Sequence, residues 1–304
     1  MSPKKKKDPR EQSLEELIER AETIIEALPY ISAFRGAVIV IKYGGSAMLD
    51  DKLKQSVIQD IALMELVGMK VVVVHGGGPA INEHLDRLGI QPQFVEGLRV
   101  TTAETLDVVG MVLSRLNREV VSALNRSGAS AAGLTGKDAS LIEARKQVTR
   151  KPNGETGPDL GFVGEVERIN PRILRLLLND NIIPVVMPVG FNTQEGQSYN
   201  INADTVAAAI AAEMKADKLV LLTEAPGILR DRKDLASVIP QIHRDEVEPL
   251  IAEGVIQGGM IPKARACLKS LRAGVGKTHI LDGRLPHCLL LEILTEKGIG
   301  SLIY

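Results

Sequence analysis

The chain has 304 residues, which is long enough for one large α/β domain or for two lobes. Its formal net charge is −1, so we expect neither a nucleic-acid nor a membrane partner. No apolar run is long enough to cross a bilayer, and Cys267 and Cys288 lack the spacing of a metal site, which together predict a cytoplasmic protein with no metal ligands of its own.

The N-terminal arm, residues 1–35, precedes the first predicted strand. It contains four consecutive lysines, Lys4 to Lys7, which we interpret as a solvated tail. Ser13 and Glu16 have the spacing of a capping box, and apolar residues then repeat at helical spacing as far as Pro29. We therefore predict an amphipathic helix over 13–28.

Strands and helices alternate from residue 36 onward. The apolar runs predict strands at 37–42, 71–74, 129–134, 182–187, 218–223 and 279–281. The helical periodicity predicts helices near 50–67, 79–88, 102–125, 171–180, 203–214, 244–252, 259–272 and 286–294. Two short runs, 141–144 and 162–166, flank a turn-rich stretch and predict an inserted β-hairpin. The expected fold class is α/β, with a mostly parallel central sheet.

Two glycine turns directly follow buried strands. One strand ends at Lys42 and leads into Gly44 and Gly45, and another ends at His75 and leads into three glycines, 76–78. A glycine turn before a helix exposes backbone N–H groups, which bind anions. The turn at Gly76 lacks the Rossmann spacing, and Gly276-Lys277-Thr278 lacks the first glycine of a Walker A loop. One such turn could be purely structural, but two of them with a lysine favour a site for a highly charged reaction.

Three further segments place polar groups at strand ends or helix starts. Asn200, Asn202 and Asp204 are more than one helix N-cap requires. Lys263 lies in the first turns of a predicted helix, where its charge opposes the helix dipole. Arg99 could be an ordinary surface charge, or it could clamp a carboxylate through its planar fork.

In order and approximate spacing, these segments resemble the amino acid kinase family. The matching motifs lie at 42–45, 74–79, 97–101, 200–204 and 258–263, and the resemblance covers the chain from about Phe34 to Tyr304. It implies a three-layer α/β/α sandwich, with an acyl-acceptor lobe at 36–212 and a nucleotide lobe at 213–304. The middle motifs are most similar to the members that phosphorylate the γ-carboxylate of N-acetyl-L-glutamate with ATP and Mg²⁺, a step of arginine biosynthesis.

The resemblance also assigns roles to individual residues. Lys42 and Lys263 match the cations that stabilise the transferring phosphoryl group, and Asp204 matches the acid that holds them. The substrate-binding positions are Gly77, Gly78, Arg99 and Asn200. The nucleotide-binding positions are Gly45, Gly76, Glu224, Gly227, Ile228, Leu229, Gly259 and Met260, with Glu224 standing where the family often has Asp. A carboxylate acceptor is already ionised at neutral pH, so this chemistry needs no general base.

Regulation is implied by similarity to the arginine-responsive branch of the family. That similarity places an arginine effector site near His287, Glu292 and Gly298. The same branch carries an N-terminal helix that joins dimers, which implies a hexamer built as a trimer of dimers; alternatively, helix 13–28 covers its own domain. The sequence also resembles the kinases of oxygenic phototrophs, some of which bind the PII signalling protein, so PII is a further candidate partner.

Two other functions remain open from the sequence. The chain could be a kinase of the same family for aspartate, carbamate or an α-aminoadipate derivative, or it could be a non-catalytic sensor of nucleotide or arginine. The presence of Lys42, Asp204 and Lys263 favours an enzyme, because a sensor has no need of phosphoryl-transferring lysines.

Overall fold

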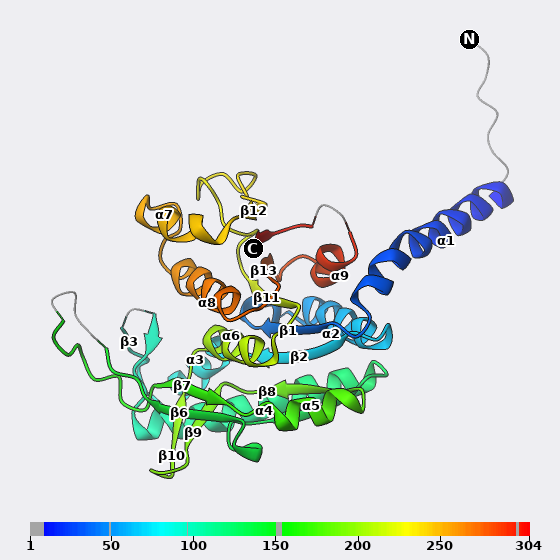
Figure 1. The fold of residues 1–304 in the computed structure, drawn as a ribbon. Helices are drawn as coiled ribbons and strands as arrows, with labels where there is room; N and C mark the ends of the chain where they lie inside the picture. Colours follow the sequence, from blue (N-terminus) through cyan, green and yellow to red (C-terminus); the bar gives the residue numbers. More distant parts are fainter. Residues whose placement is uncertain (1–8, 49, 96, 150–153, 296–297) are drawn as a thin grey trace.

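The computed structural model describes residues 9–48, 50–95, 97–149, 154–295 and 298–304. Its main sheet contains the strands β1 (Val38–Tyr43), β2 (Lys70–His75), β5 (Ser130–Leu134), β8 (Ile182–Val186), β11 (Lys218–Thr223), β12 (Gln241–Ile242), β13 (Lys277–Asp282) and β14 (Ser301–Ile303). They lie in the order β12-β14-β13-β11-β1-β2-β8-β5 (Figure 1). Every neighbouring pair is parallel except β13 and β14, so the predicted fold class is confirmed.

Helices cover both faces of this sheet and so create three layers (Figure 1). One face carries α2 (Asp51–Leu66), α4 (Ala103–Arg126) and α9 (Cys288–Ile293), and the other carries α5 (Arg172–Asn179), α6 (Ala203–Met214) and α8 (Met260–Arg272). Side chains alternate between the two faces, so Ile39 and Ile41 pack beneath α2 while Val40 packs beneath α6. Burial on both faces explains why the strands are continuous aliphatic runs.

A second, smaller sheet stands beside the first. It contains β6 (Ile142–Lys146), β7 (Gly164–Ile169), β9 (Val189–Asn192) and β10 (Gln197–Asn200), in the order β10-β9-β6-β7. The predicted hairpin is confirmed as the antiparallel pair of β6 and β7. The prediction missed β9 and β10, which are short and partly polar. Their pairing brings Asn200 back to the carboxyl end of β8, beside the main sheet.

Helix α1 spans Pro9–Phe34 and projects away from the sheet (Figure 1). The predicted boundaries were wrong at both ends, because Ser13 lies inside the helix and the helix continues through Pro29. Pro29 has no N–H to donate, but Ile25, whose carbonyl loses that partner, is exposed to solvent. The side chains of Leu17 and Ile24 are 56% and 67% exposed, so α1 does not cover its own domain. The lysine run Lys4–Lys7 lies outside the described residues.

The remaining described elements are short connections around the sheet. They are α3 (Gly78–Arg87), α7 (Val247–Ala252), the paired strands β3 (Phe94–Val95) and β4 (Leu98–Arg99), and the 3₁₀ turns η1 (Gly45–Met48), η2 (Asp138–Ser140) and η3 (Arg244–Glu246). Across the described ranges, no helix is both long enough and apolar enough to span a membrane.

Candidate active site

The two glycine turns lie side by side at the carboxyl edge of the main sheet. Strands β1 and β2 are parallel neighbours, with Lys42 opposite Val74, and the Gly76 N–H donates to the Tyr43 carbonyl at 2.7 Å. A Cβ atom added to Gly44 would lie 3.0 Å from the Lys42 Nζ atom. Gly44 therefore lies in tight contact with the end of the lysine side chain, a neighbour that the sequence did not reveal.

Asp204 brings two lysines from distant parts of the chain together. It lies in the first turn of α6, where the Asn202 side chain caps the helix by accepting from the Asp204 N–H at 2.9 Å. Its Oδ1 atom is 3.2 Å from Lys42 Nζ, and its Oδ2 atom accepts a hydrogen bond from Lys263 Nζ at 2.5 Å. Lys42 comes from the end of β1 and Lys263 from the first turn of α8, so the predicted catalytic residues form one cluster.

Burial controls the charge of this cluster. Burial would raise the pKa of Asp204, but the adjacent Lys42 and Lys263 outweigh it and hold the pKa below its usual value. Burial and the charge of Lys263 lower the pKa of Lys42, and Asp204 opposes this shift. Asp204 is thus ionised at neutral pH and forms ion pairs with the buried Lys42 and the half-buried Lys263 at once.

An acceptor cavity of about 290 Å³ opens on one side of the cluster. It is lined by Lys42, Gly45, Gly76, Gly77, Gly78, Arg99, Asn200 and Asp204, together with residues such as Phe94 and Pro188. All four predicted substrate-binding residues therefore line the acceptor cavity. Gly45 and Gly76, which were predicted to contact nucleotide, also line this cavity.

Arg99 is held as a preformed anion-binding group at the wall of the acceptor cavity. Its Nη2 atom donates to Asn82 Oδ1 at 2.6 Å, and its guanidinium lies 4.8 Å from the centre of the Phe94 ring. Its buried Nη1 atom finds no hydrogen-bond acceptor among the described residues. A carboxylate in the cavity would supply one. Asn82 on α3 and Phe94 on β3 were not predicted, because each contacts Arg99 from a different element.

A nucleotide cavity of about 460 Å³ lies on the other side of the cluster. Its lining includes the predicted residues Glu224, Gly227, Ile228, Leu229, Gly259 and Met260, and also Lys263. Gly45 joins the two cavities, because a Cβ added to it would lie 3.0 Å from Glu224 Oε1. The two lysines therefore each line one cavity, with Asp204 between them.

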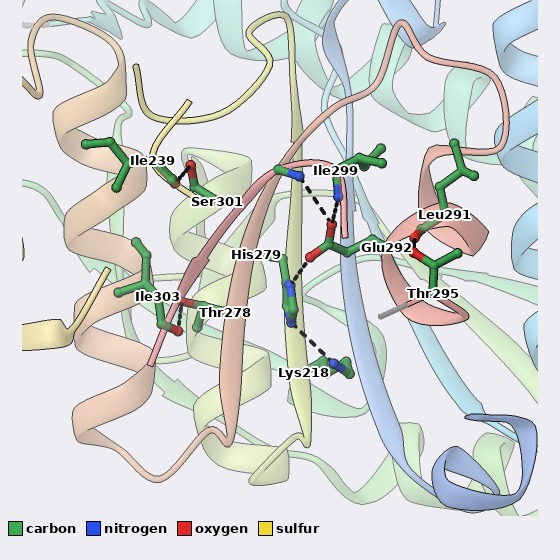
Figure 2. A network of polar contacts seen from close by, with 11 residues as sticks. Lys218, Ile239, Thr278, His279, Leu291, Glu292, Thr295, Ile299, Ser301 and Ile303 are labelled. Atoms are coloured by element: carbon green, nitrogen blue, oxygen red, sulfur yellow. Dashed lines mark hydrogen bonds and ion pairs between the residues drawn. The ribbon is translucent and has the colours of Figure 1, made fainter. Parts of the chain in front are cut away.

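The three predicted effector residues do not all come together. Glu292 Oε1 is bonded to the His279 Nδ1 atom at 2.7 Å, and its Oε2 atom accepts from the Ile299 N–H at 2.7 Å (Figure 2). Gly298 lies against the same carboxylate, since an added Cβ would be 2.8 Å from Glu292 Oε2. His287 instead contacts α2, where its Nδ1 atom is 2.6 Å from Asp60 Oδ1.

Two residues of this network were missed from the sequence. Lys218 Nζ lies 3.4 Å from the Nε2 atom of His279, on the neighbouring strand (Figure 2). Burial lowers the pKa of His279, although the Glu292 carboxylate opposes that shift. Both residues lie on predicted strands, where a polar side chain in a mostly apolar run could have indicated a functional position.

Fold and site together define a phosphotransferase of the amino acid kinase type. The model of the amino acid kinase family matches residues 37–282, and the chain belongs to this family. Among its relatives, the acetylglutamate kinase of Heliobacterium modesticaldum is 53% identical over 290 residues, covering 94% of this chain and 98% of the relative. The acetylglutamate kinase of Acaryochloris marina is 52% identical over 286 residues, with the same coverage of 94% and 98%.

Solved structures show the same fold. An N-acetylglutamate synthase from Neisseria gonorrhoeae, complexed with coenzyme A and N-acetyl-glutamate, has a TM-score of 0.81 at 24% identity. A second structure of that synthase, complexed with coenzyme A and L-arginine, has a TM-score of 0.77 at 23% identity. Each match covers 93% of this chain, but the chain spans only 63% and 65% of the two synthase chains.

Proposed function

We propose that the chain is an acetylglutamate kinase, which transfers the γ-phosphoryl group of ATP to the γ-carboxylate of N-acetyl-L-glutamate in arginine biosynthesis. One observation carries this proposal: a single buried carboxylate, Asp204, holds Lys42 and Lys263 at the boundary between two cavities. Phosphoryl transfer between two anions needs cations at that boundary more than it needs a covalent partner. The acetylglutamate kinases found among the relatives support the choice of acceptor.

In the proposed mechanism, the acceptor occupies the cavity that contains Arg99 and Asn200. Arg99 grips the α-carboxylate through its unpaired Nη1 atom, and Asn200 lies beside it on β10. The backbone N–H groups of Gly77 and Gly78, at the start of α3, bind the γ-carboxylate. This arrangement directs an ionised oxygen at the phosphoryl group without a general base.

ATP occupies the cavity on the opposite side of the cluster. Its phosphates reach Lys263 at the start of α8, and the phosphoryl group passes between Lys263 and Lys42. Both lysines stabilise the charge on that group during transfer. Asp204 keeps the two ammonium groups close before the phosphates arrive.

Mg²⁺ is proposed to enter with ATP. In the described part of the chain, no three His, Cys, Asp or Glu side chains are close enough to form a metal site. Asp204 is already held by two lysines, which leaves Glu224, beside Gly45, to supply at most one ligand. That donor set fits Mg²⁺ carried mainly by phosphate oxygens, where the ion would neutralise phosphate charge.

A coupled assay of ADP release tests the proposed function directly. The purified chain should turn over with ATP and N-acetyl-L-glutamate, and much more slowly with glutamate, aspartate or carbamate. Preference for another acceptor would assign the chain to a different member of the family. ATP binding without turnover on any acceptor would instead indicate a sensor.

Arginine is the proposed effector, and its site is the network around Glu292. The buried Glu292 carboxylate, with His279 and Lys218 beside it, offers both charge and hydrogen-bonding groups to a guanidinium or an α-carboxylate (Figure 2). The network lies next to α1, since Lys218 Nζ is 4.7 Å from the centre of the Phe34 ring. Arginine bound there would contact the base of that helix.

A hexamer is the proposed assembly, joined through α1. The exposed apolar residues of this helix are Leu14, Leu17, Ile18, Ile24, Ile25 and Leu28. Pairing of two such helices about a two-fold axis would bury them and link dimers into a closed ring. Binding of the PII protein and a cytoplasmic location remain predictions from the sequence.

A further inference from the structure

His75 interrupts an otherwise apolar row on β2. Along this strand Val71, Val73 and His75 point to the face covered by α4, and all three are fully buried. A buried imidazole is costly unless its nitrogens are hydrogen-bonded. The ring directly precedes the glycine turn of the acceptor cavity, so its partners are of functional interest.

The partners of the ring fix its tautomer. Nδ1 lies 2.9 Å from the Gly76 carbonyl oxygen, which can only accept, so Nδ1 carries the proton. Nε2 lies 3.1 Å from the Asn117 Nδ2 atom, which also donates to the Val185 carbonyl at 2.8 Å. Because that second contact orients the amide, Nε2 must accept. The ring is therefore neutral, with its proton on Nδ1.

The hydrogen bond from His75 Nδ1 to the Gly76 carbonyl controls the direction of the Gly76–Gly77 peptide group. The Gly76 N–H is held by the Tyr43 carbonyl at 2.7 Å, and the Gly76 carbonyl is held by the His75 ring. The Gly76–Gly77 peptide is trans, so its C=O and N–H point in opposite directions. With the carbonyl turned toward the buried ring, the Gly77 N–H is turned away from that ring, and Gly77 itself lines the acceptor cavity.

We propose that His75 is a positioning residue for phosphoryl transfer, which holds the Gly76 carbonyl so that the Gly77 N–H stays aimed at the reacting anion. This inference rests on the role proposed above for the glycine turn. Asn117 assists by blocking Nε2, since a proton there would face another donor. Gly133 makes room for Asn117, because a Cβ at that position would lie 2.0 Å from Asn117 Oδ1.

Two substitutions separate positioning from packing. The amide nitrogen of His75→Asn can occupy the place of Nδ1 and still donate to Gly76, whereas the amide of His75→Gln reaches the place of Nε2 and leaves Gly76 unheld. We expect kcat to fall at least about tenfold in His75→Gln, part of the loss seen when such a donor is removed, and by less than about threefold in His75→Asn. The KM for ATP should not change in either variant.

A packing role predicts the opposite order, because Gln is closer to His in volume than Asn is. Equal kcat losses, or a larger loss in His75→Asn, would therefore overturn the proposal. His84→Gln is the matched control, since the Nδ1 atom of His84 also bonds a carbonyl, that of Ala80, but outside both cavities. Its kcat should equal that of the wild type.

A spectroscopic measurement tests the contact without turnover or variants. The ¹⁵N shifts of the His75 ring in the wild-type protein should show a neutral, Nδ1-protonated tautomer at pH 7, with and without N-acetyl-L-glutamate. An Nε2-protonated or charged ring would overturn the proposal, even if the variants failed to fold. If the tautomer is as expected but the wild type phosphorylates none of the acceptors, the proposed function fails and the contact stands.

Discussion

Asp204 forms ion pairs with both Lys42 and Lys263. Since each lysine lines a different cavity, neither can replace the other during transfer. We expect Lys42→Ala and Lys263→Ala each to lower kcat at least about a hundredfold, the usual effect of losing one such electrostatic group. Lys52→Ala, at an exposed position on α2, is the control and should leave kcat unchanged. Near-normal turnover by either folded variant would contradict the assignment.

Arg99 should govern affinity for the acceptor more than chemistry. Losing a hydrogen bond to a charged group costs about 1.5–3 kcal/mol, or about ten- to a hundredfold in binding. Arg99→Ala should therefore raise the KM for N-acetyl-L-glutamate by that factor and leave the KM for ATP nearly constant. Initial rates over a grid of both substrates provide the measurement. The reverse pattern would mean that the two cavities have been assigned the wrong way round.

His75 should also make stability depend on pH. Burial lowers its pKa from 6.5 to about 4. The unfolded chain therefore takes up a proton before the folded chain does, so stability is complete above about pH 6.5 and falls as the pH drops toward 4. Between pH 7 and pH 5, the free energy of unfolding should fall by about 2 kcal/mol more in the wild type than in His75→Asn. Urea titrations at both pH values measure this difference, and equal losses would contradict it.

At the scale of single residues, the sequence predicted those site residues whose type was unusual for their local position. Lys263 at a helix start and Asp204 beyond a needed cap were such cases, and both lie in the cluster. Residues that act through another residue were not predictable in this way. Asn82 matters because it touches Arg99, and Gly44 because Lys42 passes over it, and neither contact follows from spacing along the chain.

At the scale of elements, two histidines next to α9 are candidates for the effector site. His279 on β13 contacts Glu292 near the end of α9, while His287 at its start contacts Asp60 on α2. We therefore expect His279→Gln, whose amide cannot take the place of Nδ1, and Glu292→Ala each to raise the arginine concentration for half-inhibition at least about tenfold, because each removes a hydrogen bond to a charged group. His287→Ala should change it much less. Inhibition curves at fixed substrate concentrations would show whether the sequence-based choice of His287 or the structure-based choice of His279 holds.

Elements with a strong apolar period were predictable, and short elements were not. Strands β1, β2 and β11 are buried on both faces, so their aliphatic runs identified them. Strand β14 has three residues and forms by pairing with β13 and β12, contacts that are distant in sequence. Helix α1 exceeded its predicted end because an exposed helix tolerates a proline better than a buried one does.

At the scale of the whole molecule, α1 is the element that its own chain leaves uncovered. Deleting residues 1–28 should convert the proposed hexamer to a dimer, because the apolar stripe that joins dimers would be gone. Activity should survive, since both cavities lie on the sheet. Arginine inhibition should weaken, because Phe34, which the deletion leaves against Lys218 of the effector network, would no longer connect that network to a paired helix. Light scattering and inhibition curves test these points separately: a persisting hexamer contradicts the pairing, and unchanged inhibition excludes the helix from regulation.

The predicted acceptor and nucleotide lobes share one sheet, in which β1 of the first pairs with β11 of the second from Ile39 to Lys42. The lobes have no flexible linker between them, since α6 ends at Met214 and β11 begins at Lys218. We therefore expect a movement of one lobe that brings ATP toward the acceptor to change the twist of this sheet. The hydrogen bonds between β1 and β11 would resist twisting of one lobe against the other. Their resistance would limit how far the enzyme can open to release its products.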